Sequence, residues 1–307
     1  MYVGPSIKKT PKIEKRPYQT FQTEDKIIEE IVNRFTYVLE QNISKENLQL
    51  FYNNLSSIKI KNKNVFLGFL SEIFKTNSVS GQYFLDDNSI RILPLITNNI
   101  LSKFIGVGIE NYTINLCHEF LHMSSTIVDK KTNIAFSGFS QIGTSSVGIS
   151  LDEAYTEILL YRYFNFDKSL MSYKYEVEIV KLIDEIIGKD IMTNLYFNAD
   201  LYNFIVHLQK YIEVEEILMF IQNLDSIFVL EDYGTRYKNN IIYYHNSVIE
   251  FLVNVYKNKL GIELKEGKID INSSIIKLYD FTCRINKCYS KLELEKSKVK
   301  KREIMTK

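Results

Sequence analysis

Cysteine, proline and glycine are scarce in this 307-residue sequence, and long apolar runs are missing. Three cysteines cannot build a disulfide framework, and no signal peptide is seen, so we expect a cytoplasmic protein. Twelve glycines and four prolines favour long helices over a turn-rich β-sandwich. No apolar run approaches the roughly 20 residues that span a bilayer, so no membrane span is expected.

An excess of either charge is missing too. Lys and Arg number 38 and Asp and Glu number 37, which leaves a net charge of +1. A protein that binds mainly to nucleic-acid phosphates is normally more basic, so no nucleic-acid partner is expected. The 45% of hydrophobic and 24% of charged residues are typical of a globular chain with a buried core, which excludes full-length disorder.

The hydrophobic pattern predicts an α+β fold that is mostly helical and divides the chain into four parts. Residues 1–20 carry three of the prolines and several lysines, and we expect an extended arm there. Residues 21–165 mix helical patterns with one strand pattern, and 166–290 are mostly helical and are expected to form the other wall of a cleft. Residues 291–307 hold seven Lys or Arg against three Glu, which is typical of a solvated, frayed helix end.

Strand-like alternation is clearest over 82–93, where Asp86-Asp87-Asn88 predicts the turn of a β-hairpin. Residues 133–150 are rich in serine and glycine and are predicted to be a loop. Its glycines would permit a mobile flap next to a functional site. Helices are predicted from Thr23 and from Ser44, and over 66–74, 107–125, 151–164, 173–187, 201–211, 214–229, 241–260 and 275–288.

The chemistry is concentrated in His118-Glu119-Phe120-Leu121-His122. On a helix that turns about 100° per residue, His122 lies about 40° from His118, so both imidazoles project side by side and can share one ion. Glu119 lies about 100° from His118, which suits a carboxylate that acts on water rather than on the metal. The chain has only four histidines, so an accidental match is rare. The alternative is that these residues cap a core without any metal.

A third ligand is expected on the helix that begins near Leu151. Glu153 and Glu157 lie four residues apart, on one face that continues with Leu160 and Phe164. Two carboxylates on an apolar stripe repel each other unless a cation lies nearby. We therefore expect Glu153 to bind the metal and Glu157 to accept the distal N–H of a histidine ligand. The reverse assignment and a solvent-facing pair are the alternatives.

These two segments, His118 to His122 and Asp152-Glu153-Ala154-Tyr155-Thr156-Glu157, resemble the paired helix motifs of the gluzincin (thermolysin-like) zinc metallopeptidases. The resemblance covers about residues 82–164 and implies a zincin-like fold that acts on a peptide or protein substrate. It implies one zinc ion per chain bound by His118, His122 and Glu153, with Glu119 as general base and Glu157 as a supporting carboxylate. The segment between the motifs is longer than in thermolysin.

No motif places the transition-state histidine of that family. His207 and His245 are candidates, each more easily explained as a core histidine, and Tyr83, Tyr155 and Tyr161 are further candidates. A non-catalytic, zinc-stabilised binding or regulatory protein is the competing hypothesis, and it requires a fourth protein ligand such as His207, His245 or a cysteine. Two histidines and one carboxylate also suit non-haem iron, but that chemistry needs no base at Glu119.

Overall fold

The computed structural model describes residues 7–13, 23, 25–62, 81–85, 87–93, 108–231 and 237–304. The fold is mostly helical, as the sequence predicts, and the described residues form two small β-sheets, of which the sequence predicts one. None of the described helices combines the length and the apolar character that crossing a membrane requires. The predicted helix over 66–74 and most of the predicted arm lie outside the described residues, and residues 7–13 have no regular secondary structure.

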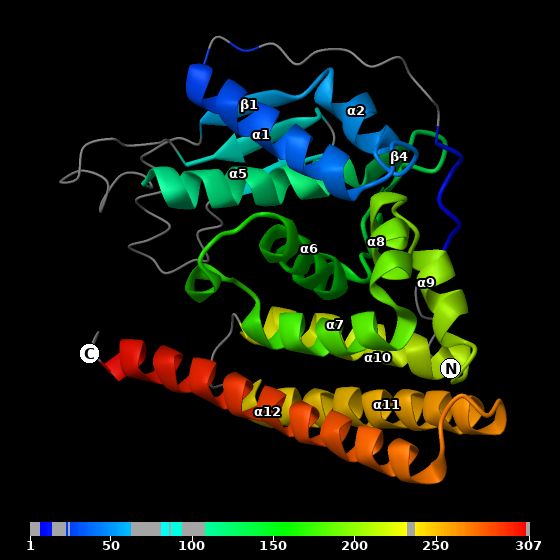
Figure 1. Ribbon diagram of the computed structural model, residues 1–307. Coiled ribbons are helices and arrows are strands. Elements are labelled where there is room, and N and C mark those ends of the chain that lie inside the picture. Colours follow the sequence, from blue (N-terminus) through cyan, green and yellow to red (C-terminus); the bar gives the residue numbers. More distant parts are fainter. Residues whose placement is uncertain are drawn as a thin grey trace.

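Figure 1 shows the elements stacked in layers, from the first sheet and the early helices down to the last two helices. The helices are α1 (Lys26–Asn42), α2 (Gln49–Leu55), α5 (Ile109–Ser124), α6 (Ile149–Tyr163), α7 (Lys174–Ile187), α8 (Lys189–Phe197), α9 (Leu201–Leu208), α10 (Val214–Glu231), α11 (Lys238–Lys265) and α12 (Ile271–Ile304). The sequence analysis missed α8, and α12 runs through most of the predicted basic tail.

The first sheet contains the predicted hairpin. Strands β2 (Gly81–Phe84) and β3 (Ser89–Ile92) pair in antiparallel fashion, and Tyr83 lies opposite Ile90. An unpredicted strand, β1 (Lys59–Asn62), pairs in parallel with β3, so the order is β1-β3-β2 and β2 lies at an edge of the described sheet.

Two of the three strands of the second sheet lie in residues 133–150, where the sequence analysis predicted a loop, so that prediction is wrong there. Strands β4 (Thr126–Asp129), β5 (Ile134–Ser137) and β6 (Ser140–Ile142) form an antiparallel sheet in that order. The strands are only three or four residues long, and the serines and glycine around them hid the short apolar run. Gly138, at φ +49°, makes the tight β5–β6 turn possible, because residues with a Cβ rarely adopt that conformation.

Helices α5 and α6 share an aromatic anchor. The ring of Phe35 on α1 lies 5.3 Å from that of Phe120 on α5 and stacks at 5.2 Å on Phe164, which ends α6. Phe120 is fully buried together with Leu116 and Leu121, as the apolar back of this helix predicts. These contacts hold the polar front of α5 against α6.

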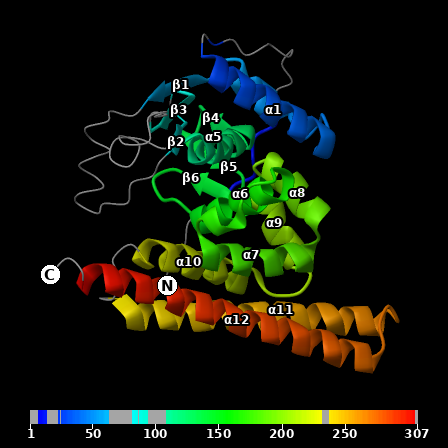
Figure 2. The same ribbon diagram turned by 60° about the vertical axis from the view of Figure 1, so that its left-hand side comes forward.

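The helices α7, α10, α11 and α12 lie on the side of α6 opposite to α5 (Figures 1 and 2). Helices α7 and α10 pack against α6, and α11 and α12 form the outermost pair. Asp225 of α10 binds the start of α6: its carboxylate accepts hydrogen bonds from the N–H groups of Gly148 at 2.7 Å and Ser150 at 2.9 Å. Two of the amides that a helix leaves unpaired at its N-terminus are thereby satisfied.

Candidate metal centre

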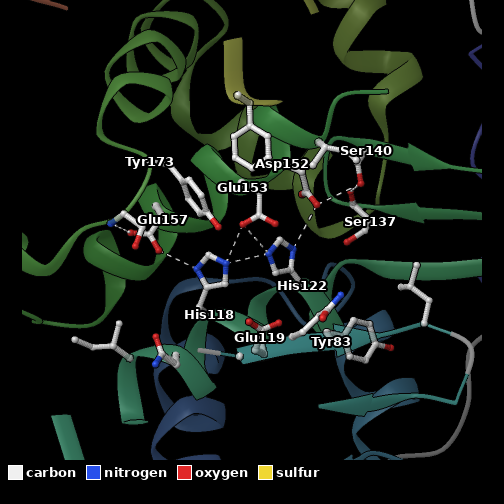
Figure 3. A pocket seen from close by; sticks show the side chains of 18 of the residues that line it. Tyr83, His118, Glu119, His122, Ser137, Ser140, Asp152, Glu153, Glu157 and Tyr173 are labelled. Atoms are coloured by element: carbon white, nitrogen blue, oxygen red, sulfur yellow. Dashed lines mark hydrogen bonds and ion pairs between the residues drawn. The ribbon is translucent and has the colours of Figure 1, made fainter. Parts of the chain in front are cut away.

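Helices α5 and α6 bring His118, His122 and Glu153 together (Figure 3). The two Nε2 atoms of the histidines lie 3.1 Å apart, and Oε2 of Glu153 lies 3.2 Å from Nε2 of His118 and 3.5 Å from Nε2 of His122. Three potential ligand atoms thus face a common point. Among the described residues, this is the one group of three or more His, Cys, Asp or Glu whose geometry suits a metal ion.

The spacing of these three atoms fits a tetrahedral ion. Zinc binds imidazole nitrogen and carboxylate oxygen at about 2.0–2.1 Å, so two ligands of a tetrahedral site lie about 3.3–3.4 Å apart. The observed separations of 3.1, 3.2 and 3.5 Å bracket that value. The residues present can therefore hold a metal ion without rearrangement of either helix, although this geometry does not identify the element.

A carboxylate lies behind His118. Its Nδ1 is 2.9 Å from Oε1 of Glu157, and the other oxygen of Glu157 accepts the backbone N–H of Ser172 at 2.9 Å. A hydrogen bond from Nδ1–H to a carboxylate selects the tautomer whose Nε2 lone pair is free for a metal. The structure thus brings Glu157 to the distal nitrogen of a histidine, the contact that its spacing from Glu153 suggests.

A second carboxylate lies behind His122, and the sequence analysis did not assign it a role. Oδ2 of Asp152 is 3.4 Å from Nδ1 of His122. Asp152 also accepts the N–H of Phe139 at 3.2 Å and the hydroxyl of Ser140 at 3.3 Å, both in the β5–β6 hairpin. In the sequence, the only indication of this role was that Asp152 directly precedes Glu153, about 100° round the helix. The sequence analysis did not predict the β5–β6 hairpin whose groups bond to Asp152.

The electrostatics of the centre favour a cation. Burial alone would lower the pKa of His118, but hydrogen bonds to Glu153 and Glu157 raise it to about 10. The pKa of His122 is likewise raised, because Glu153 and Asp152 outweigh its desolvation. For Glu153, burial opposes ionisation, but the two adjacent imidazoles lower its pKa. Three carboxylates around two histidines therefore draw positive charge to this point.

Glu119 lies beside the three ligand atoms and is not one of them (Figure 3). Its side chain is only 6% exposed, and burial raises its pKa, while His118, His122 and the backbone N–H of Tyr83 act to lower it. A Cβ on Gly81 would lie 2.9 Å from Oε1 of Glu119, so a larger residue would force this carboxylate to move. Edge strand β2 is thus held against the carboxylate.

Tyr173 is a second residue that the sequence analysis missed. It precedes α7 in the left-handed region at φ +50°, a conformation that a large side chain rarely adopts and that often marks a functional position. Its ring lies 6.4 Å from that of His118 and 5.4 Å from that of Phe228. Burial, then the charge of Glu153 and a hydrogen bond to it, raise the pKa of Tyr173, so its hydroxyl stays protonated as a donor.

Most of the residues that the sequence analysis named as candidates for the transition-state donor lie away from the cleft. His207 of α9 contacts Lys210, which follows that helix, at 3.3 Å, and His245 is buried and bonded to the hydroxyl of Tyr175 at 2.8 Å. Neither these histidines nor Tyr155 and Tyr161 line the cleft at the centre. Tyr83 does line it.

The centre lies in a cleft of about 540 Å³ between β2 and α5 on one side and α6, the β5–β6 hairpin and the start of α7 on the other. Its apolar wall includes Ile114, Ile149, Leu170 and Phe228. Its described lining contains four carboxylates, Glu119, Asp152, Glu153 and Glu157, and no Lys or Arg. The cleft therefore offers a large, acidic and open approach to the three ligand atoms.

Comparisons with protein-family models, with curated proteins and with solved structures find no match. The interpretation of this centre therefore depends on its own geometry.

Proposed function

We propose that the protein is a zinc-dependent metallopeptidase. One observation carries the proposal: two Nε2 atoms and one carboxylate oxygen at 3.1–3.5 Å from one another, each histidine backed by a carboxylate, beside a buried glutamate outside the ligand set. A structural metal site needs no such glutamate, whereas hydrolysis by an activated water needs a base next to the ion.

The side chains of the centre have three roles: binding the ion, orienting the histidines and transferring protons. His118, His122 and Glu153 would hold the ion, while Glu157 and Asp152 keep the imidazoles oriented. Zinc, when bound, would supply a Lewis acid that polarises the scissile carbonyl and acidifies water. Glu119 would take the proton of the attacking water and deliver it to the leaving amine. The raised pKa that burial gives Glu119 suits a group that both accepts and returns a proton.

Tyr173 is the best placed donor for the negative charge that develops on the carbonyl oxygen. Its hydroxyl faces Glu153 and His118, next to the point that the three ligand atoms share (Figure 3). A donor fixed by an unusual backbone conformation needs little reorganisation when charge develops.

An extended polypeptide is the substrate that the cleft suits best. Strand β2 lies at an edge of its sheet in the described part of the chain, and its Gly81, Gln82 and Tyr83 line the cleft. A peptide that adds to this edge forms backbone hydrogen bonds whatever its side chains are. Such pairing would align a peptide bond with Glu119, which touches the same strand.

The competing binding-protein hypothesis requires a fourth protein ligand. No other histidine and no cysteine lines the cleft in the described part of the chain, which leaves three ligands and an open position. This arrangement supports the catalytic proposal. Iron remains an alternative that metal analysis separates from zinc.

The test combines metal analysis with a peptide library. We expect about one zinc ion per chain in the purified protein and cleavage of library peptides that a chelator abolishes. The Glu119→Gln variant should keep the metal but lose cleavage by about 10²–10⁴-fold. A metal-loaded protein that cleaves no peptide, or a Glu119→Gln variant of full activity, would contradict the proposal.

A further inference from the structure

A second cavity of about 580 Å³ adjoins the catalytic cleft. Leu85, just after β2, and Ile142, at the end of β6, line both cavities, so the two cavities meet at these residues. Apolar residues of the second sheet line the second cavity, among them Val128, Ile134 and Ala135, and so do Lys8 and Gln141.

The two cavities carry opposite charge. The catalytic cleft is lined by four carboxylates and, among the described residues, by no Lys or Arg. The described lining of the second cavity has one cation, Lys8, and no Asp or Glu. An acidic side chain is therefore repelled from the catalytic cleft and attracted to the second cavity.

The backbone of Lys8 is bonded to the second sheet. Its N–H donates to Oε1 of Gln141 on β6 at 2.8 Å, and the hydroxyl of Thr10 donates to the carbonyl of Ala199. Lys9 lies over the ring of Tyr202 at 4.8 Å and so contacts a different element. The segment 7–13 thus forms a strap that is bonded to β6 and to Ala199, and Lys8 of this strap lines the cavity.

The direction of β2 determines which part of a bound peptide substrate reaches this cavity. Gly81 lies against Glu119, whereas Leu85 lies at the junction of the two cavities. A substrate that pairs antiparallel with β2, the more stable arrangement, runs from the second cavity towards Glu119. At about 3.3 Å per residue, the offset of four positions between Gly81 and Leu85 places the second cavity about three to five substrate residues before the scissile bond.

We propose that the second cavity is a substrate subsite that selects an acidic side chain about three to five residues N-terminal to the scissile bond, with Lys8 as the residue that recognises it. The inference rests on the proposed peptidase function and adds the substrate class: extended polypeptides with Asp or Glu upstream of the cut.

Peptides that differ only in charge test this proposal. Internally quenched peptides built on a cleaved library sequence would carry Glu, Ala or Lys at each of these positions in turn. We expect kcat/KM for the Glu peptide to exceed that of the Ala peptide about two- to fivefold at low salt, the range typical of an exposed ion pair, and the ratio to approach one in 1 M salt. The Lys8→Glu variant should reverse the preference in favour of Lys.

Lys12→Glu is the matched control, because Lys12 is an exposed lysine of the same strap that does not line the cavity. It should keep the wild-type ratio of Glu to Ala peptides. A binding measurement without turnover adds a second readout: fluorescence anisotropy of labelled Glu and Ala peptides on zinc-loaded Glu119→Gln protein should show the same two- to fivefold preference, lost in Glu119→Gln/Lys8→Glu.

The outcomes separate the two proposals. Cleavage without a charge preference, or an equal effect of Lys8→Glu and Lys12→Glu, overturns the subsite and leaves the peptidase standing. A zinc-loaded protein that cleaves no peptide overturns both.

Discussion

Asp152 joins His122 to the β5–β6 hairpin: one of its oxygens lies 3.4 Å from Nδ1 of the imidazole, and its carboxylate accepts hydrogen bonds from Phe139 and Ser140. The ring on α5 is thereby oriented by a sheet that lies between the two helix motifs in sequence. Glu157 does the same for His118 through the N–H of Ser172. Each histidine is fixed by a different part of the fold.

Replacing these supports should weaken metal binding without abolishing it. Asp152→Asn and Glu157→Gln keep the side-chain size but remove the charge that orients Nδ1–H, and loss of such partners typically costs about 10–100-fold in metal affinity. Zinc affinity measured by competition with a chelator checks this. Glu153→Ala should lose the ion altogether, and His207→Ala, outside the cleft, should bind zinc as the wild type does. Equal losses in Glu153→Ala and Glu157→Gln would show that the ligand assignment is wrong.

Gly138→Ala should destabilise the protein and disturb the centre together. Its φ of +49° disfavours a Cβ, which would also lie 1.9 Å from Oδ1 of Asp152. We expect a loss of at least about 2 kcal/mol in the free energy of unfolding, together with weaker zinc binding. Gly143→Ala is the control, because its nearest neighbour would be Ile134 at 3.4 Å and its φ is not positive. Chemical denaturation of both variants decides, and equal stability of the two would refute the explanation.

Removal of one hydroxyl tests the role of Tyr173. Tyr173→Phe keeps the ring against His118 and Phe228 but removes the donor, so kcat should fall about 10²–10³-fold while KM and zinc content change little. Tyr243→Phe, at an exposed position, should match the wild type. A purely structural role for Tyr173 would appear instead as a lower melting temperature with kcat unchanged.

Asp225 gives the protein a specific dependence on pH. Burial raises its pKa from 3.8 to about 6, partly offset by the N–H groups of Ser150 and Gly148. The folded state therefore binds this proton more tightly than the unfolded state, and the stability it contributes is present below about pH 4 and lost as the pH rises to about 6. Two pKa units correspond to about 3 kcal/mol.

The Asp225→Asn variant isolates this effect. Relative to Asp225→Asn, the wild type should gain up to about 3 kcal/mol in the free energy of unfolding as the pH falls from 7 to 4, because all other titrating groups are common to both proteins. Urea denaturation at several pH values measures the difference. A constant difference between the two proteins across that range would rule out a raised pKa at Asp225.

The sequence predicted most of the helices, the β2–β3 hairpin and the positions of the histidines, because these depend on local spacing. The 3.6-residue period alone puts His118 and His122 on one edge of α5 and Glu153 and Glu157 on one face of α6. It did not reveal Tyr173 or Asp152, because their roles depend on long-range packing: the start of α7 returns to the cleft, and the β5–β6 turn closes over Asp152. The second sheet was missed because its strands are short and surrounded by polar residues.

The hydrogen bonds from Gly148 and Ser150 to Asp225 also decide which shortened forms of the chain keep a stable candidate site. Asp225 belongs to α10, whereas Gly148 and Ser150 open the helix that carries Glu153. A fragment that ends before Val214 would retain every proposed ligand but leave the first turn of that helix without its acceptor. A fragment made of residues 21–165 alone should therefore be less stable than the full chain, and shortened versions of this protein for expression should retain α10.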